Sequence, residues 1–210
     1  MESASASETK PVSFELLGLG HLTEVKSVLV DAYRHERTFQ GLFEANRDGF
    51  EQRLRAFVRE YCLQHFDQRQ SVVGARLDGR LVGVALLCEP SHQGALNASR
   101  RARLGLALTV GIRCAKRYLT YQDQLRAVMP DSPWCYLPLV GVLESHRGLG
   151  VGAGLLNDVW SRVERIPGAT GIALGSGAAA AASFYQNLGF EPVGQMAFEG
   201  TVETLFYRAT

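Results

Sequence analysis

Residues 142–154 read Val-Leu-Glu-Ser-His-Arg-Gly-Leu-Gly-Val-Gly-Ala-Gly, a glycine-rich turn between an apolar stretch and an amphipathic one. Small residues at the start of a helix let several backbone N–H groups approach a bulky anion, and the helix dipole adds partial positive charge there. Arg147 adds a full charge at the mouth of the turn. The stretch therefore predicts a site for a phosphate or pyrophosphate group.

Two other phosphate-binding designs fit this turn less well. A P-loop needs the pattern GxxxxGK[ST], and no lysine is present here. A dinucleotide-binding loop matches loosely through Gly148, Gly150 and Ala153, but that design expects an acidic residue at the end of the next strand. The next apolar run ends Ala-Leu-Gly-Ser at residues 173–176, without an acid. Both alternatives are therefore disfavoured.

The turn and a second segment together resemble the GNAT superfamily of N-acetyltransferases. Residues 147–152 match its R/Q-x-x-G-x-G/A motif, and the apolar approach at 134–142 is similar to the strand that precedes that motif. Residues 183–190 contain a tyrosine followed by x-x-x-G-F, which resembles the second signature of the family. An Asp-Gly hairpin at residues 78–79 lies where the family places its second and third strands.

The resemblance implies a fold and a co-substrate. The expected fold is of the α+β (mixed α/β) class, with a mostly antiparallel central sheet that splays between a long fourth strand and a fifth strand, flanked by helices. The expected co-substrate is acetyl-CoA, with its pyrophosphate on the turn and its pantetheine arm along the backbone of the fourth strand. The implied binding residues are Val140, Val142, Arg147, Gly148, Leu149, Gly150, Val151, Gly152 and Tyr185.

The implied reaction moves an acetyl group to a primary amine by direct attack on the thioester. An ammonium must first lose a proton, and the departing thiolate must gain one. The resemblance gives the acid role to Tyr185. The base is open between Glu144, which ends the approach strand, and Glu89, which ends the third strand; further alternatives are a water relay, His92, His146 and Asp123. Ala181 replaces an asparagine that many relatives carry, so one contact to the pantetheine region is in doubt.

The acceptor amine is left undefined by the motifs. By resemblance, its site is bordered by the first helices, by the insertion at 91–131 and by the turn at 198–201. We expect Tyr33, Arg34, Arg37 and Phe39 to contact it, with His35 beside them. These aromatics and arginines suit a small amine that also carries an anionic or planar part, loosely similar to the acceptors of antibiotic-acetylating enzymes. Protein or peptide acetylation and a non-catalytic acyl-CoA sensor are the alternatives.

Composition bounds the class of protein. The chain has 210 residues, 46% hydrophobic and 20% charged, with a net charge of +1, so a buried core is expected and a nucleic-acid partner is not. A local excess of +6 over residues 97–129 indicates either a solvated helical face or a basic wall beside an anion. Four scattered cysteines without a CxxC pair predict free thiols and no metal site.

Localisation and organisation follow from the apolar runs and the termini. The longest runs, 81–88 and 104–112, are too short to cross a bilayer, and residues 1–9 lack a secretory core. We therefore expect a cytoplasmic monomer or homodimer without a membrane partner. Residues 1–11 are predicted to be a disordered tail, and 12–210 a single acyltransferase domain with a helical insertion at about 91–131.

Hydrophobic periodicity and turn residues predict the elements. Strands are expected at 14–17, 71–77, 81–88, 134–144, 170–174, 191–195 and 201–208. Helices are expected at 22–37, 50–62, about 151–166 and from a Ser176 cap to 188, with one or two in the insertion and a loop at 39–48. Pro138 cannot donate to a ladder, so it belongs at an edge, at a bulge or where strands part.

Overall fold

The structure, a computed structural model, describes residues 11–90, 100–129, 133–178 and 181–210. The tail predicted at 1–11 lies outside this range except for its last residue, as do His92 and the first nine residues of the insertion. Within the described ranges, no helix combines the length and the apolar character that crossing a membrane requires.

The described residues form strands and helices that are interspersed along the chain. The strands are β1 (Ser13–Leu16), β2 (Ser71–Leu77), β3 (Arg80–Leu87), β4 (Cys135–Leu137), β5 (Val140–Val142), β6 (Gly171–Ser176), β7 (Glu191–Phe198) and β8 (Thr201–Ala209). The α-helices are α1 (Leu22–Tyr33), α2 (Arg37–Leu42), α3 (Phe50–Asp67), α5 (Arg100–Val110), α6 (Ile112–Val128), α7 (Val151–Val163) and α8 (Ala182–Asn187).

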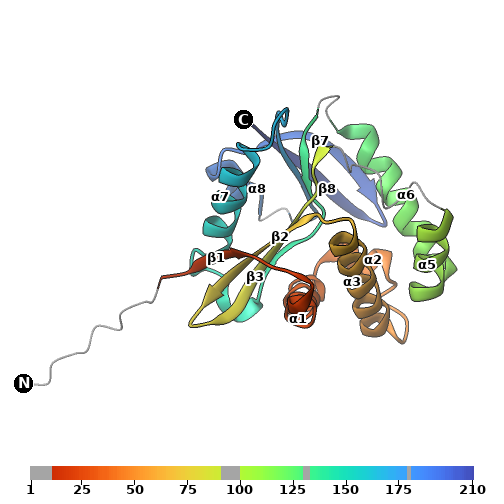
Figure 1. The fold of residues 1–210 in the computed structure, drawn as a ribbon. Coiled ribbons are helices and arrows are strands. Elements are labelled where there is room, and N and C mark those ends of the chain that lie inside the picture. Colours follow the sequence, from red (N-terminus) through yellow and green to blue (C-terminus); the bar gives the residue numbers. More distant parts are fainter. Residues whose placement is uncertain (1–10, 91–99, 130–132, 179–180) are drawn as a thin grey trace, which may run out of the picture.

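The strands form two four-stranded sheets that diverge from each other. The first has the order β1-β2-β3-β5 and is antiparallel throughout. The second has the order β4-β6-β8-β7, in which only β4 and β6 run parallel. The predicted α+β fold, with antiparallel sheets flanked by helices, is confirmed; Figure 1 shows α7 and the α5–α6 pair on opposite sides of it.

The strand expected at 134–144 is divided between these sheets. β4 pairs with β6, where Cys135 faces Ile172, whereas β5 pairs with β3, where Val142 faces Gly83. Pro138 lies in the two-residue gap between them. Because proline offers no N–H to a ladder, the division falls where pairing is weakest. The segment stays beside the β3 end throughout, because Cys88 pairs with Tyr136 and Leu86 N donates to Leu139 O at 2.9 Å. Its pairing with β6 ends at Leu137, and the two sheets part there.

Two helices pack on opposite faces of β3 and β5. A Cβ at Gly83 would meet Val151 of α7 at 3.3 Å, and a Cβ at Gly141 would overlap Ala32 of α1. Successive residues of a strand point to opposite faces, so these two glycines let α7 and α1 approach closely. Leu155 of α7 and Leu29 of α1 are fully buried there. This packing fixes the start of α7 relative to the end of α1.

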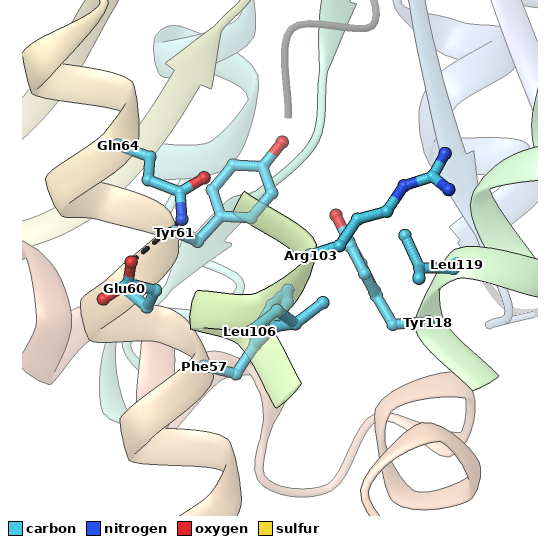
Figure 2. Close-up of a pocket in the computed structure, with 8 residues that line it drawn as sticks. All are labelled: Phe57, Glu60, Tyr61, Gln64, Arg103, Leu106, Tyr118 and Leu119. Carbon is cyan, nitrogen blue, oxygen red and sulfur yellow. Dashed lines mark hydrogen bonds between the residues drawn. The ribbon is translucent and has the colours of Figure 1, made fainter. Parts of the chain in front are cut away.

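The predicted insertion forms two helices that share the core of the domain. Figure 2 shows side chains of α3, α5 and α6 converging on a small hollow, where Gln64 donates to Glu60 at 2.9 Å. The hollow has a volume of about 20 Å³, too little for more than a water molecule. Beside the hollow, the ring centroids of Phe57 of α3 and Tyr118 of α6 lie 4.9 Å apart. The insertion is therefore part of the same packed unit.

Two basic residues of α6, Arg113 and Arg117, face a buried carboxylate instead of the space between the sheets. Glu44 is 5% exposed and pairs with Arg113 at 2.7 Å, Arg47 at 2.9 Å and Arg117 at 3.7 Å. Arg117 also pairs with Glu199 at 3.3 Å. Part of the local positive charge is thus neutralised within the molecule.

Candidate active site

A cavity of about 680 Å³ lies between the diverging sheets. Its walls come from α1, α2, α6, β4, β5, the start of α7, the end of β6, α8 and β8. Residues from nearly the whole length of the chain therefore meet at one place. The described residues contain no group of three or more His, Cys, Asp or Glu side chains that could hold a metal ion.

The start of α7 forms one end of the cavity. Gly148 and Gly150 have φ of 77° and 76°, a region that favours glycine, and a Cβ on either would meet no heavy atom within 4 Å. No side chain caps the helix, and Gly154 N makes the bond to Gly150 O at 3.0 Å. The earlier N–H groups of the first turn have no intrahelical partner. This end suits an anion.

The predicted loop residues divide into two groups. The cavity is lined by Arg147, Gly148, Gly150 and Gly152. Leu149 and Val151 do not line it: the Leu149 side chain is 62% exposed, and Val151 is buried in the core. These two can contribute backbone groups only. The guanidinium of Arg147 donates to Ala32 O at 3.2 Å, at the end of α1.

Tyr33 lies against the backbone in the middle of the cavity. Its hydroxyl accepts from Val140 N at 2.9 Å and lies 3.2 Å from Val140 O, to which it can donate. One hydroxyl can thus hydrogen-bond to both the N–H and the C=O group of Val140. Val140 and Val142 line the cavity as predicted. No pattern in the sequence indicates that Tyr33 contacts this backbone.

Two carboxyl groups form the other end of the cavity. Glu203 of β8 is 4% exposed and accepts from Thr38 Oγ1 at 3.0 Å and from the Tyr121 hydroxyl at 2.6 Å. The pKa of Glu203 is raised to about 7, chiefly by burial; the Tyr121 hydrogen bond opposes this shift, and the nearby Glu36 carboxyl adds to it. Burial also raises the pKa of Glu36. Glu36 caps α2, accepting from Phe39 N at 2.9 Å.

The end of β6 makes room for these carboxyl groups. A Cβ at Gly175 would overlap Glu203 Oε1, and one at Gly177 would come within 2.8 Å of Glu36 Oε1. Ser176 between them lines the cavity. A side chain at 175 would therefore displace the carboxyl group of Glu203, and one at 177 would displace Thr38 and Glu36.

Tyr185 of α8 lines the cavity and packs against Phe206 at 5.1 Å between ring centroids. Burial raises the pKa of its hydroxyl to about 12, with a hydrogen bond to Ser176 opposing the shift. The group is thus protonated at neutral pH and can donate. α8 is shorter than predicted and begins after Ala181 instead of at a Ser176 cap; residues 179–180 lie outside the described range.

The two glutamates expected to serve as base are placed elsewhere. Neither Glu144 nor Glu89 lines the cavity. Glu144 is exposed in a short 3-10 turn, and its backbone N–H donates to Asp31 at 2.9 Å. Glu89 is half-buried, and its N–H donates to Gln70 at 2.9 Å.

The expected acceptor residues are likewise divided. Tyr33 and Phe39 line the cavity, whereas Arg34 and Arg37 do not. Arg34 pairs with Glu51 at 3.3 Å, and Arg37 is exposed. His35 lines the rim.

Four residues that line the cavity were not predicted from the sequence: Glu36, Thr38, Tyr121 and Glu203. One signal for Glu203 was available, because alternation along β8 places it on the same face as Leu205, which is buried. Val202, on the other face, is 57% exposed. A glutamate at an inward position of a strand indicates a functional site.

The comparison with known protein families gives the class to which this fold belongs. The model of the Acetyltransferase (GNAT) family matches residues 34–190. The chain belongs to this family, whose enzymes generally use acetyl-CoA. No curated protein matches the chain.

Solved structures share the fold at low sequence identity. A histone acetyltransferase HPA2 and related acetyltransferase from Corynebacterium glutamicum matches with a TM-score of 0.68 and 23% identity, over 94% of this chain and 95% of that one. A polyamine N acetyltransferase of Drosophila melanogaster has a TM-score of 0.63 and 14% identity, over 95% and 100%. An agmatine N-acetyltransferase mutant has a TM-score of 0.61 and 15% identity, over 95% and 99%.

Proposed function

We propose that this chain transfers the acetyl group of acetyl-CoA to a primary amine of a small molecule, by direct attack of the amine on the thioester. The observation that carries the proposal is the polarity of the cavity. One end offers a helix N-terminus and Arg147, and the other offers Glu36 and Glu203. An anionic co-substrate and a cationic acceptor can therefore enter one space from its two ends.

The residues at the α7 end fit a pyrophosphate. The backbone of the turn, including Leu149 and Val151, supplies N–H donors, and Arg147 supplies a full positive charge. The glycines at 148, 150 and 152 leave the backbone open to close approach. Val140, Val142 and Tyr185 line the path from this end toward Glu203 and would border the pantetheine arm. Bound acetyl-CoA supplies the activated acetyl group.

Two side chains provide the proton transfers. In place of Glu144 and Glu89, we assign the base to Glu203, because it lines the cavity and its pKa of about 7 leaves it partly ionised at neutral pH. Glu203 takes a proton from the ammonium, and the freed nitrogen lone pair forms the new C–N bond as the C–S bond breaks. Tyr185 donates its proton to the departing thiolate, and the second proton on the acetylated nitrogen passes to the Tyr185 oxygen. The products are then the neutral amide, the thiol of CoA, neutral Tyr185 and protonated Glu203.

The cavity favours a small acceptor. It is ringed by aromatic side chains, including Tyr33, Phe39, Tyr121 and Tyr136, and its acidic end is buried. The structural neighbours described as polyamine and agmatine N-acetyltransferases support a small amine. Because one structural neighbour is described as a histone acetyltransferase, a protein acceptor is the alternative.

The experiment is an assay of thiol release from acetyl-CoA with a panel of primary amines, at pH 5.5 to 8.5. A base with a pKa of about 7 must be ionised to act, so kcat/KM should be level above that pH and fall tenfold per unit below it. Glu203→Gln should lower kcat by about 10²–10⁴-fold and remove the inflection. Glu144→Gln, the matched control, should retain wild-type activity. An active Glu203→Gln enzyme, or an inactive Glu144→Gln enzyme, would contradict the assignment.

A further inference from the structure

Glu203 is a buried carboxyl group, and Glu36 is half-buried with its Oε1 atom buried. Within the described ranges, neither forms an ion pair. Glu44, which is buried to the same extent as Glu203, is contacted by three arginines. Burying a carboxylate costs free energy unless a charge or hydrogen bonds compensate it. The two carboxyl groups of the cavity therefore have hydrogen bonds but lack the cations that the same chain provides for Glu44.

The hydrogen bonds around the two carboxyl groups leave one oxygen unused. Thr38 has a single hydroxyl proton, which it donates to Glu203 Oε2 at 3.0 Å. Phe39 N donates to Glu36 Oε2. Glu36 Oε1 is buried and has no hydrogen-bond partner among the described residues. The catalytic steps above use Glu203 and Tyr185, so this oxygen of Glu36 is free for a ligand.

The side chains around Glu36 and Glu203 disfavour an acceptor that carries an anionic group. Phe39, Tyr121 and Tyr136 present aromatic rings to the cavity, and such rings attract cations. Arg34 and Arg37, which the sequence suggested as partners for an anionic part of the acceptor, do not line it. An acceptor with a carboxylate next to its amine would place that carboxylate close to Glu36 and Glu203, where like charges repel.

We propose that Glu36 is a substrate-binding residue that, together with Glu203, captures the acceptor as its ammonium ion, and that the acceptors are basic alkyl amines without a carboxylate beside the nitrogen. Glu36 accepts a hydrogen bond from the ammonium on Oε1 and holds it while Glu203 removes a proton. The inference rests on the proposed function, because it concerns the acceptor of the same reaction. It replaces the expectation of an amine with an anionic part.

The test uses two probes that differ by one carboxylate, 2-phenylethylamine and phenylalanine. Their binding to the complex of the protein with CoA is measured by titration calorimetry, and their acetylation by thiol release. The amine should bind at least tenfold more tightly than the amino acid. Glu36→Gln keeps an oxygen for the α2 cap and should weaken amine binding at least tenfold, with CoA affinity unchanged. Glu51, which does not line the cavity, supplies the control: Glu51→Gln should match the wild type.

A second variant separates binding from folding. Glu36→Asp keeps the charge and can still cap α2, so its unfolding temperature should match the wild type and its amine affinity should lie between those of the wild type and Glu36→Gln. Amine affinity within twofold of the wild type in Glu36→Gln, or equal binding of the two probes, would overturn the inference. Acetylation of both probes without preference would overturn it while leaving the proposed function intact. If the amine binds in a way that depends on Glu36 but is not acetylated, the inference about Glu36 stands and the proposed acetyl transfer is refuted. If neither probe binds, the inference and the proposed function are both refuted.

Discussion

Gly150 precedes α7 with φ of 76°, and space for a side chain exists beyond it. Gly150→Asp should place a carboxylate among the N–H groups proposed to hold the pyrophosphate, and CoA affinity should fall at least 100-fold. Asparagine tolerates the same backbone conformation, so Gly150→Asn is the matched control and should cost less than tenfold. Titration calorimetry with CoA measures both. Equal losses in the two variants would show that charge at this turn is irrelevant.

Tyr185 tests the second proton transfer. Tyr185→Phe removes the hydroxyl but keeps the ring that packs on Phe206, so CoA affinity should stay within twofold while kcat falls about 10–100-fold. Because the pKa of the hydroxyl is about 12, wild-type activity should show no loss from its ionisation up to pH 10. Steady-state kinetics of both proteins measure these values. An unchanged kcat would remove Tyr185 from the mechanism.

The end of β6 affects catalysis through the space it leaves. In Gly175→Ala the new methyl group would overlap Glu203 Oε1, so the carboxylate must move from its bonds with Thr38 and Tyr121. We expect kcat/KM for the amine to fall at least tenfold, with CoA affinity unchanged. Gly20→Ala, where a Cβ meets nothing within 4 Å, is the control and should be neutral. Wild-type kinetics in Gly175→Ala would show that the position of Glu203 is unimportant.

Elements with a strong local pattern could be predicted from the sequence. The hairpin of β2 and β3 and the apolar stripe of α7 agree with the structure because turn chemistry and periodicity are local signals. The division at Pro138 was indicated only as one of three options, since the sequence does not say which sheet each half joins. α2, predicted as a loop, is a six-residue helix capped by Glu36, with Thr38, Phe39 and Leu42 buried. Packing against the rest of the molecule determines so short a helix.

The candidate site was predictable at one end only. The anion end is continuous in sequence, so its motif was visible. At the acidic end, Glu203 is hydrogen-bonded to Thr38 and to Tyr121, which are 165 and 82 positions away in the sequence. No local pattern encodes such contacts. Sequence proximity to the turn and the hairpin instead favours Glu144 and Glu89 as the base. The fold brings together the residues that the motifs left out.

At the scale of the whole molecule, the two sheets part at one proline and leave a cavity that is positive at one end and acidic at the other. No cysteine lines this cavity within the described ranges, and Tyr185 is assigned to proton donation. Acetyl-CoA and the amine must therefore be bound together, with the acetyl group passing directly between them.

The most direct test is the initial-rate pattern of acetyl transfer, with acetyl-CoA varied at several fixed concentrations of a primary amine. Direct attack within a ternary complex predicts double-reciprocal lines that intersect, and no release of thiol in the absence of amine. Parallel lines, with one equivalent of CoA released before any amine is added, would show a covalent acetyl-enzyme and contradict the account.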